Sequence, residues 1–226
     1  MSSALRTDAI ILRRTNYGEA DRILNVITPD DGQLSVMARG VRKEKSRLAG
    51  GIELFAVCDI VLHRGKSDLA TLTGSKMKVF YDKIMTDYNR MQFGYEAIRR
   101  VSGASKTVDE PEFYELLHDS LEALNNLEIN QTIIETWFYL KLTKLLGNEL
   151  NTATDNNGMK LLEGMQYNFD ISDQAFVFSE KGQYSTSHIK LLRVIANNPP
   201  SVITKVAGID EIIDDCLRLA QIVAKI

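Results

Sequence analysis

The sequence predicts an α+β chain in which a small closed β-barrel precedes an α-helical domain. Within the first 80 residues, five short segments rich in β-branched and apolar residues alternate with turn-forming residues. From about residue 82, apolar residues recur at the spacing of amphipathic helices. At 226 residues and 44% hydrophobic content, the chain can bury one large core or two small ones. We therefore predict a barrel domain over residues 1–81 and a helical domain over residues 82–226.

The predicted barrel contains five strands, most of them joined by tight turns. Asn16-Tyr17-Gly18 and Pro29-Asp30-Asp31-Gly32 have the composition of turns, and Gly74 predicts a bulge or sharp bend in the last strand. An open sheet of such short strands would expose its edges, so we expect a closed barrel. The strand count fits an OB-fold barrel, and an SH3-like barrel is the alternative. The predicted strands span residues 8–15, 20–28, 33–39, 54–64 and 69–81.

The second domain is predicted to hold five helices and one long irregular segment. The first helix ends at Gly103, a residue suited to a C-cap, and the second opens with acidic residues and Pro111. The third helix is apolar nearly all round, which predicts the central helix of the domain. Residues 148–187 are too long for an ordinary connection. The predicted helices span residues 89–103, 109–127, 131–147, 188–198 and 210–226.

Several observations indicate a reduced, non-membrane compartment. No apolar run reaches the roughly 18 to 20 residues that a membrane span needs, and the N-terminus lacks the layout of a signal peptide. Cys58 and Cys216 lie far apart in apolar-patterned segments, so we expect buried thiols rather than a disulfide, with Cys58 facing the barrel core. We therefore expect a cytoplasmic protein.

Motifs for catalysis are weak in this sequence. Gly65-Lys66-Ser67 copies the end of a phosphate-binding P-loop, but the first glycine of that motif would fall at Ile60, inside a predicted strand. The three histidines lie in different segments, without a metal ligand or an acid–base partner at motif spacing. We therefore expect no enzymatic activity. These histidines are His63, His118 and His188.

The most distinctive local feature is the basic loop, defined here as residues 37–51 (MARGVRKEKSRLAGG). It holds five basic side chains against a single acid, Glu44. The chain has a net charge of −3, but residues 1–80 carry +4 and residues 81–226 carry −7. This asymmetry suggests a polyanion bound by the first domain, because clustered Lys and Arg release counterions from a phosphate backbone, and a chance split of charge is the alternative. For the loop itself, the alternative is a solvated loop that serves only solubility.

The predicted DNA-binding residues combine this loop with basic side chains from neighbouring strands and turns. On a small barrel, such groups can line one groove and follow a nucleic-acid strand. Phosphate contacts carry no sequence information, so the expected binding is independent of sequence. The predicted residues are Arg13, Arg14, Arg39, Arg42, Lys43, Lys45, Arg47, Arg64, Lys66, Lys76 and Lys78.

The run from DAIILRRTNYGEADR to SRLAGGIELF resembles the N-terminal domain of the RecO recombination-mediator family. The resemblance covers roughly residues 5–80. It is carried by the first strand, the turn Gly18-Glu19-Ala20-Asp21, the hairpin Thr28–Gly32, the step Ala38-Arg39-Gly40, the positions Arg42, Lys43 and Ser46, and the strand entry at Phe55.

This resemblance implies an OB-fold followed by an α-helical domain, and a non-enzymatic function. Family members bind single- and double-stranded DNA and anneal complementary strands in DNA repair and recombination. With RecR, they assist the loading of RecA on DNA coated with the single-stranded DNA-binding protein. The alternative is a barrel-plus-helix adaptor that binds protein and not nucleic acid.

The resemblance also implies an origin for residues 148–187. Many family members carry a four-cysteine zinc site there, as two C-x-x-C pairs, but the equivalent positions here lie in Thr154–Gly158 and Phe178–Lys181 and contain no cysteine. These side chains cannot form the thiolate cage that structural zinc prefers, so we expect a degenerate zinc-knuckle-like insertion and no cofactor. The expected core of this β-knuckle is Tyr167, Phe169, Phe176 and Phe178.

Overall fold

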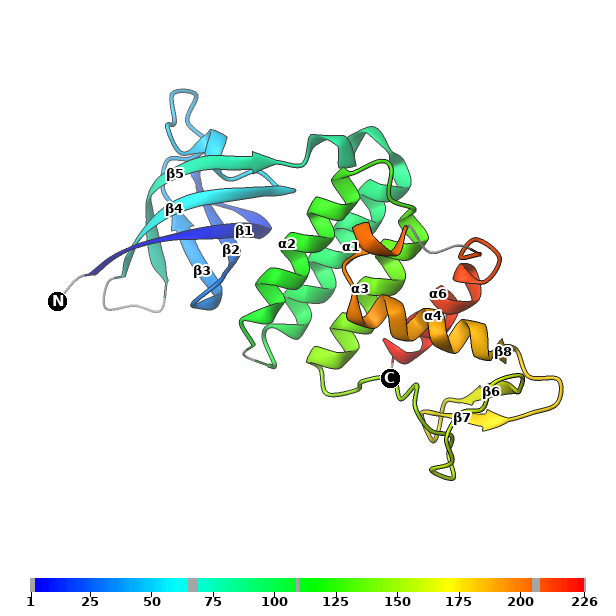
Figure 1. Ribbon diagram of the computed structural model, residues 1–226. Helices are drawn as coiled ribbons and strands as arrows, with labels where there is room; N and C mark the ends of the chain where they lie inside the picture. Colours follow the sequence, from blue (N-terminus) through cyan, green and yellow to red (C-terminus); the bar gives the residue numbers. More distant parts are fainter. Residues whose placement is uncertain (1–2, 65–68, 109, 205–207, 226) are drawn as a thin grey trace. The chain divides into compact units, whose positions relative to one another are not determined.

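A computed structural model describes residues 3–64, 69–108, 110–204 and 208–225 (Figure 1). The chain divides into two compact units, the barrel unit of residues 1–125 and the helical unit of residues 126–226. The change from strands to helices lies near residue 81, where the sequence predicts a domain boundary. The first two helices nevertheless group with the barrel. None of the helices in the described ranges is long and apolar enough to cross a membrane.

The barrel consists of the five predicted strands, closed in the order β1-β2-β3-β5-β4. All neighbouring pairs are antiparallel except β3 and β5, which pair in parallel at Val36 and Met37. This is the arrangement of an OB-fold, and it confirms the predicted fold class. The strands are β1 (Ser3–Tyr17), β2 (Asp21–Thr28), β3 (Gly32–Ala38), β4 (Ala56–Arg64) and β5 (Ala70–Phe80).

Alternation of side chains along the strands builds one apolar barrel core. The predicted irregularity at Gly74 is confirmed, because the register of β4 and β5 shifts between Val61–Gly74 and Leu62–Leu72. Cys58 is fully buried in this core, as predicted, and burial raises the pKa of its thiol to about 11. The core includes Ala9, Ile11, Leu24, Val26, Val36, Cys58, Ile60, Leu62 and Leu72.

Two helices of the barrel unit follow the strands through a short 3₁₀ segment, η2 (Asp82–Thr86). They are α1 (Tyr88–Ala104) and α2 (Glu112–Asn125). Phe55, which precedes β4 with φ 56°, is buried and lies against α1, where its ring centroid is 4.9 Å from that of Tyr95. Gly94 leaves room for this ring, because a Cβ at that position would lie 2.9 Å from Phe55 Cε1.

The predicted end of α1 at Gly103 is wrong by one residue, and the cap differs. Gly103 lies inside the helix, and Ser105 is the C-cap. The Ser105 hydroxyl oxygen lies 2.8 Å from the carbonyl oxygen of Val101 and 2.7 Å from Gln33 Oε1. Ser105 is itself right-handed, and the carbonyls of Gly103 and Ala104 accept backbone N–H groups of the following turn, so the helix ends without a left-handed glycine.

The helical unit is organised around α3 (Gln131–Leu145), as the sequence predicts. The buried residues of α3 are distributed around the helix, and α3 contacts α4, α5 and α6. The last helix starts three residues later than predicted, and the short helix α5 has no counterpart among the predicted elements. The remaining helices are α4 (Thr186–Asn197), α5 (Pro200–Ile203) and α6 (Ile213–Val223).

The irregular segment folds as a small three-stranded sheet in the order β7-β6-β8. Phe176 is fully buried at its centre, with ring centroids of Phe169 and Tyr184 at 5.5 and 6.0 Å. The predicted core is wrong at Phe178, which is 51% exposed, and it omits Tyr184. Phe178 and Phe176 share one short strand, yet Phe176 packs between its neighbours while Phe178 reaches the solvent at the strand's end. The strands are β6 (Gln166–Asp170), β7 (Ala175–Phe178) and β8 (Tyr184–Ser185).

Candidate nucleic-acid interface

The start of the basic loop is attached to the turn between β1 and β2. The backbone N–H of Gly40 donates to Asp21 Oδ1 at 2.7 Å, and the N–H of Arg42 donates to the carbonyl oxygen of Ala20 at 2.9 Å. The Arg42 guanidinium also donates to the carbonyl oxygen of Gly18 at 3.2 Å. These contacts use the residues of the Gly18–Asp21 turn, so that turn positions the loop.

The end of the basic loop is attached to β5. The Ser75 hydroxyl donates to the carbonyl oxygen of Leu48 at 2.9 Å. Gly51 packs so closely on the same residue that an added Cβ would lie 2.6 Å from Ser75 Oγ. Val41 and Ile52 belong to the barrel core. Apolar side chains at both ends of the loop therefore hold its charged middle at one end of the barrel.

Between these attachments, the loop is a series of turns that expose its charges. The N–H of Lys43 donates to the carbonyl oxygen of Gly40 at 3.1 Å, and the N–H of Ser46 donates to that of Lys43 at 3.0 Å. The side chains of residues 42–45 and Arg47 are exposed. Backbone hydrogen bonds thus support the loop internally, while its cationic groups stay available to a ligand.

The predicted DNA-binding residues fall into two groups. Within the described part of the chain, one group forms no ion pair, and its members are exposed: Arg13, Arg39, Arg42, Lys43, Lys45, Arg47 and Lys76. The other group is paired with carboxylates of the barrel: Arg14 with Glu53 at 2.7 Å, Arg64 with Asp31 at 2.5 Å, and Lys78 with Asp8 at 2.6 Å. Lys66 lies outside the described residues, as does the rest of Gly65-Lys66-Ser67.

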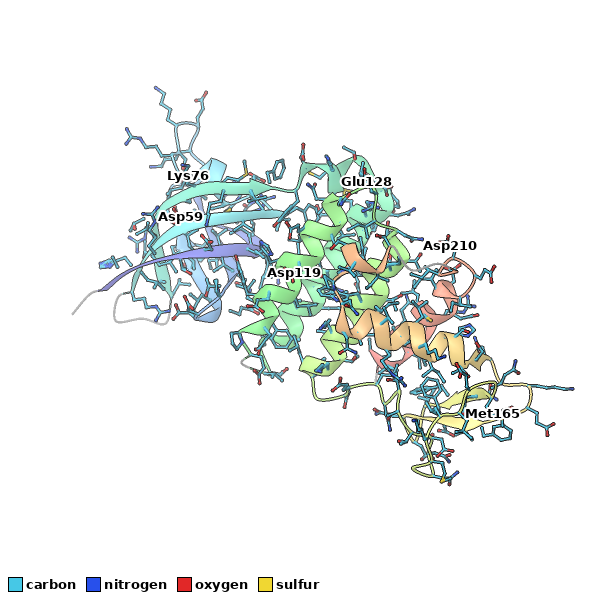
Figure 2. All side chains as sticks on the ribbon, in the orientation of Figure 1. Asp59, Lys76, Asp119, Glu128, Met165 and Asp210 are labelled. Carbon is cyan, nitrogen blue, oxygen red and sulfur yellow. The ribbon has the colours of Figure 1, made fainter. Side chains whose placement is uncertain are left out.

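Cations and carboxylates balance each other on a face of β1, β4 and β5. Asp8 and Asp59 lie directly opposite each other in the register of β1 and β4. On β5, Lys76 is opposite Asp59 (Figure 2). The Arg6 guanidinium binds both oxygens of Asp59, and with Lys78 and Lys76 it lowers the pKa of that carboxyl. We call the surface formed by the two ion pairs Arg6–Asp59 and Lys78–Asp8 the balanced face; Lys76 beside it forms no ion pair within the described ranges.

Sequence reasoning missed one exposed side chain beside the loop, Tyr17 at the end of β1. Its ring is 55% exposed, and Tyr17 pairs in register with Asp21, the residue that holds the Gly40 amide. The sequence places Tyr17 in a predicted turn, whereas the strand extends through it. The signal that identifies it is the alternation of Arg13, Thr15 and Tyr17, which places all three on the outer face of one strand.

A second cluster, in the helical unit, brings together Ser185, His188 and Asp215. Ser185 Oγ lies 2.9 Å from His188 Nδ1, and His188 Nε2 lies 3.4 Å from Asp215 Oδ2. A serine nucleophile needs a base in this position. Here, however, Nδ1 also accepts the Ser185 backbone N–H at 3.1 Å, and the two side chains form the capping box of α4. The geometry therefore serves a helix start.

A third cluster lies on α2, where ligand atoms of His118, Asp119 and Glu122 are within 4.8 Å of one another. The hydrogen bond between His118 Nδ1 and the Asp119 carboxylate, which accepts it, is the largest cause of the raised pKa of His118. All three residues come from one helix, and the two carboxylates are exposed. Neighbouring acidic groups are common on solvated helices, so this proximity alone assigns no metal.

The positions equivalent to the family's zinc ligands do not fit a zinc ion. In place of metal ligands, Asp155 Oδ1 accepts the backbone N–H groups of Asn157 and Met159, both at 2.9 Å. The N–H of Asn156 donates to the carbonyl oxygen of Phe176 at 2.9 Å. Hydrogen bonds and the aromatic core stabilise these turns, whereas a four-cysteine site would stabilise them through metal-bound thiolates.

Comparisons with known proteins match the barrel and part of the chain beyond it. The family "Recombination protein O N terminal" matches residues 1–80. A DNA repair protein RecO of Dehalococcoides mccartyi is 37% identical over 122 residues, which is 54% of this chain and 48% of that protein. A DNA repair protein RecO of Rubrobacter xylanophilus is 32% identical over 142 residues, 63% of this chain and 57% of that protein. The chain spans about half the length of the curated relatives it matches.

Proposed function

We propose that this chain, whose N-terminal domain belongs to the RecO family, binds DNA through the basic loop and acts in DNA repair and recombination. One observation carries the proposal. Both ends of the loop are fixed to the barrel, while the side chains of Arg39, Lys43, Lys45 and Arg47 are exposed and form no ion pair within the described ranges. Cations held in place without counter-charges are suited to phosphates.

The binding is electrostatic and independent of sequence. Each phosphate that the loop neutralises releases counterions, so affinity falls as salt concentration rises. Arg13 on the outer face of β1 extends the loop's charge, whereas Arg14, Arg64 and Lys78 act mainly within the barrel through their ion pairs. The residues proposed to contact DNA are therefore those of the basic loop and the exposed, unpaired cations beside it.

The test replaces Arg39, Lys43, Lys45 and Arg47 together with alanine. Arg42 is left in place, because its guanidinium attaches the loop to Gly18. We expect weaker binding to every DNA sequence, with a log–log salt slope shallower by about 0.7 for each phosphate of a single strand that the variant no longer neutralises. Fluorescence anisotropy at several salt concentrations measures both quantities.

A matched control removes the same charge elsewhere. Lys83, Lys106, Lys160 and Lys181 are exposed lysines outside the barrel strands and the basic loop. Their joint replacement by alanine changes the net charge by the same amount, and we expect it to leave the salt slope unchanged. Equal losses of affinity in the two variants would show that overall charge, not the loop, governs binding. An unchanged slope in the loop variant would make the loop a solvation surface and favour a protein-binding adaptor.

We further propose that the chain anneals complementary strands, and that it works with RecR and the single-stranded DNA-binding protein to assist RecA loading. The names of the relatives and the family of the N-terminal domain support this assignment. The test is strand annealing on DNA coated with the cognate single-stranded DNA-binding protein, with and without RecR. Failure to anneal coated strands, in a preparation that binds naked DNA, would contradict it.

The proposed function requires neither catalysis nor zinc. The capping role of Ser185 and His188 supports the first point, and we expect no labelling of Ser185 by a fluorophosphonate probe. The hydrogen-bonded turn at Asp155 supports the second. Elemental analysis should find no stoichiometric zinc, and a chelator should leave the unfolding temperature unchanged. A labelled serine or about one zinc per chain would contradict these statements.

A further inference from the structure

Tyr17 is the exposed aromatic side chain of the barrel. Among the described residues 3–64 and 69–80, the other two aromatic rings of the Phe, Trp and Tyr class, Phe55 and Phe80, are buried or partly buried. Tyr17 is 55% exposed. A large ring held at the end of a long strand presents an apolar face at little cost in side-chain entropy, because it has only two rotatable bonds.

The position of Tyr17 is fixed relative to the basic loop. The carboxylate of its register partner Asp21 accepts a hydrogen bond from the N–H of Gly40. The carbonyl oxygen of the next residue, Gly18, accepts one from the Arg42 guanidinium. Ala38, which precedes Arg39, pairs with Arg22, and Arg22 pairs with Asn16, the residue before Tyr17. Strands in a sheet lie about 4.8 Å apart, so the backbones of Ala38 and Asn16 are roughly 10 Å apart. The ring therefore lies at the attachment point of the loop.

An exposed cation, Arg13, lies on the same strand as the ring, about 13 Å along it. Arg13 and Tyr17 are both exposed, and their positions in β1 differ by four residues, which places them on the same outer face. An exposed ring that shares a strand face with one unpaired cation and adjoins the attachment of a cationic loop has the general composition of surfaces that bind single strands, where charges follow the backbone and aromatic faces receive bases.

We propose that Tyr17 stacks on an unpaired base and gives the site its preference for single-stranded over double-stranded DNA. This inference rests on the proposed function, because the loop supplies the phosphate contacts. Those contacts exist in both forms of DNA and do not distinguish them. In a duplex, each internal base is covered on both faces by its stacked neighbours. Only a single strand offers a free base face to the ring.

The experiment compares Tyr17→Ala with Tyr17→Phe. Three ligands are used: a thymine oligonucleotide, a duplex of the same length, and an oligonucleotide of the same length whose sites are abasic. We expect Tyr17→Ala to weaken binding to the thymine strand by about tenfold, the effect typical of removing one stacking ring. Binding to the duplex and to the abasic strand, and the salt slope on each ligand, should be unchanged because every phosphate contact is retained.

Tyr17→Phe keeps a ring and should keep wild-type affinity for all three ligands. Tyr88→Ala is the matched control, since Tyr88 is 70% exposed at the start of α1 in the same unit. It should change nothing. Thermal unfolding of each variant checks that the fold is intact.

Two results would overturn the inference while leaving the proposed function in place. One is wild-type affinity of Tyr17→Ala for the thymine strand. The other is an equal loss of affinity for the thymine strand, the abasic strand and the duplex, which would make Tyr17 a support for the loop. A wild-type protein that binds none of the three ligands at low salt would instead overturn the proposed function, and this inference with it.

Discussion

The basic loop and the balanced face are two cationic regions of one small barrel, and they differ in what lies beside each cation. On the balanced face, Arg6 and Lys78 contact Asp59 and Asp8. In the loop, the single acid is Glu44, and the exposed cations form no ion pair in the described part of the chain. The difference indicates that the arrangement of counter-charges, more than the number of basic residues, defines a polyanion site.

The two regions also differ in how they are held. The balanced face is built on paired strands, and the register of β1 and β4 fixes the positions of Arg6, Asp8 and Asp59. The loop depends on contacts at its two ends, with the Gly18–Asp21 turn and with Ser75. If fixed position matters for binding, damage to an attachment should weaken DNA binding even when every charge is retained.

The largest effect is therefore expected from Gly51→Ala. An added Cβ would lie 2.6 Å from Ser75 Oγ and 2.7 Å from the Ser75 carbonyl carbon, so the loop or β5 must move. We expect the free energy of unfolding to fall by about 1 to 3 kcal/mol, as for other overpacked sites, together with weaker DNA binding. Urea unfolding and fluorescence anisotropy measure the two effects.

Gly50→Ala is the control for this prediction. Nothing lies within 4 Å of a Cβ at Gly50, so both stability and DNA binding should stay close to those of the wild type. Gly51→Ala with full stability and full affinity would show that the attachment to β5 does not position the loop.

A smaller effect is expected when the counter-charges of the balanced face are removed. Asp8→Asn together with Asp59→Asn releases Arg6 and Lys78 and relieves two carboxylates that face each other in register. We expect tighter DNA binding, with a salt slope steeper by about 0.7 for each new phosphate contact. Because exposed ion pairs contribute little to stability, folding should be retained.

The same double substitution can contradict the comparison. If the variant binds DNA with the wild-type slope, counter-charges do not explain why the balanced face takes no part in binding. A variant that combines the four loop substitutions with Asp8→Asn and Asp59→Asn gives the opposite test. If it still binds DNA with a steep salt slope, the released cations form a binding site of their own, and this result supports the role of counter-charges.

Much of the barrel could be predicted because its signals are local. Alternating side chains and turn residues located all five strands, although β1 is longer at both ends than its predicted range. The charge of the loop was also readable, since its basic residues are close in the sequence. The core position of Cys58 follows from the same alternation.

Pairing of charges could not be predicted, because it depends on residues that are distant in the sequence. Arg14 and Glu53 are 39 residues apart, and Lys78 and Asp8 are 70 apart. Nothing near Lys78 in the sequence distinguishes it from Lys76, which forms no ion pair in the described ranges. In the structure, Lys76 is opposite Asp59 in register, whereas Lys78 lies at the register shift between Val57–Val79 and Cys58–Met77 and reaches Asp8 from there.

Competing local signals explain the remaining errors. Gly103 is typical of a helix end, but the helix continues to a right-handed Ser105, and backbone N–H groups of the following turn satisfy its last carbonyls. In the three-stranded sheet of the helical unit, the sequence of β7 does not distinguish its buried residues from its exposed ones. Phe176, and not Phe178, fills the core. The sheet partners that decide this question lie on β6, in a separate segment of the chain.

The smallest expected effect is a pH dependence that originates in the balanced face. The hydrogen bond from Arg6 is the largest cause of the lowered pKa of Asp59 in the folded protein. A group with a lowered folded pKa stabilises the fold fully above its unfolded pKa, about 3.9 for Asp, and the contribution disappears as pH falls through the folded value. Stability should therefore fall more steeply below about pH 4 in the wild type than in Asp59→Asn. Urea midpoints across that range measure the difference.

Asp30→Asn, which removes an exposed carboxylate that forms no ion pair within the described ranges, should follow the wild type. Parallel curves for the wild type and Asp59→Asn would show that the Arg6–Asp59 pair adds no stability, and that the balanced face is held by strand register alone.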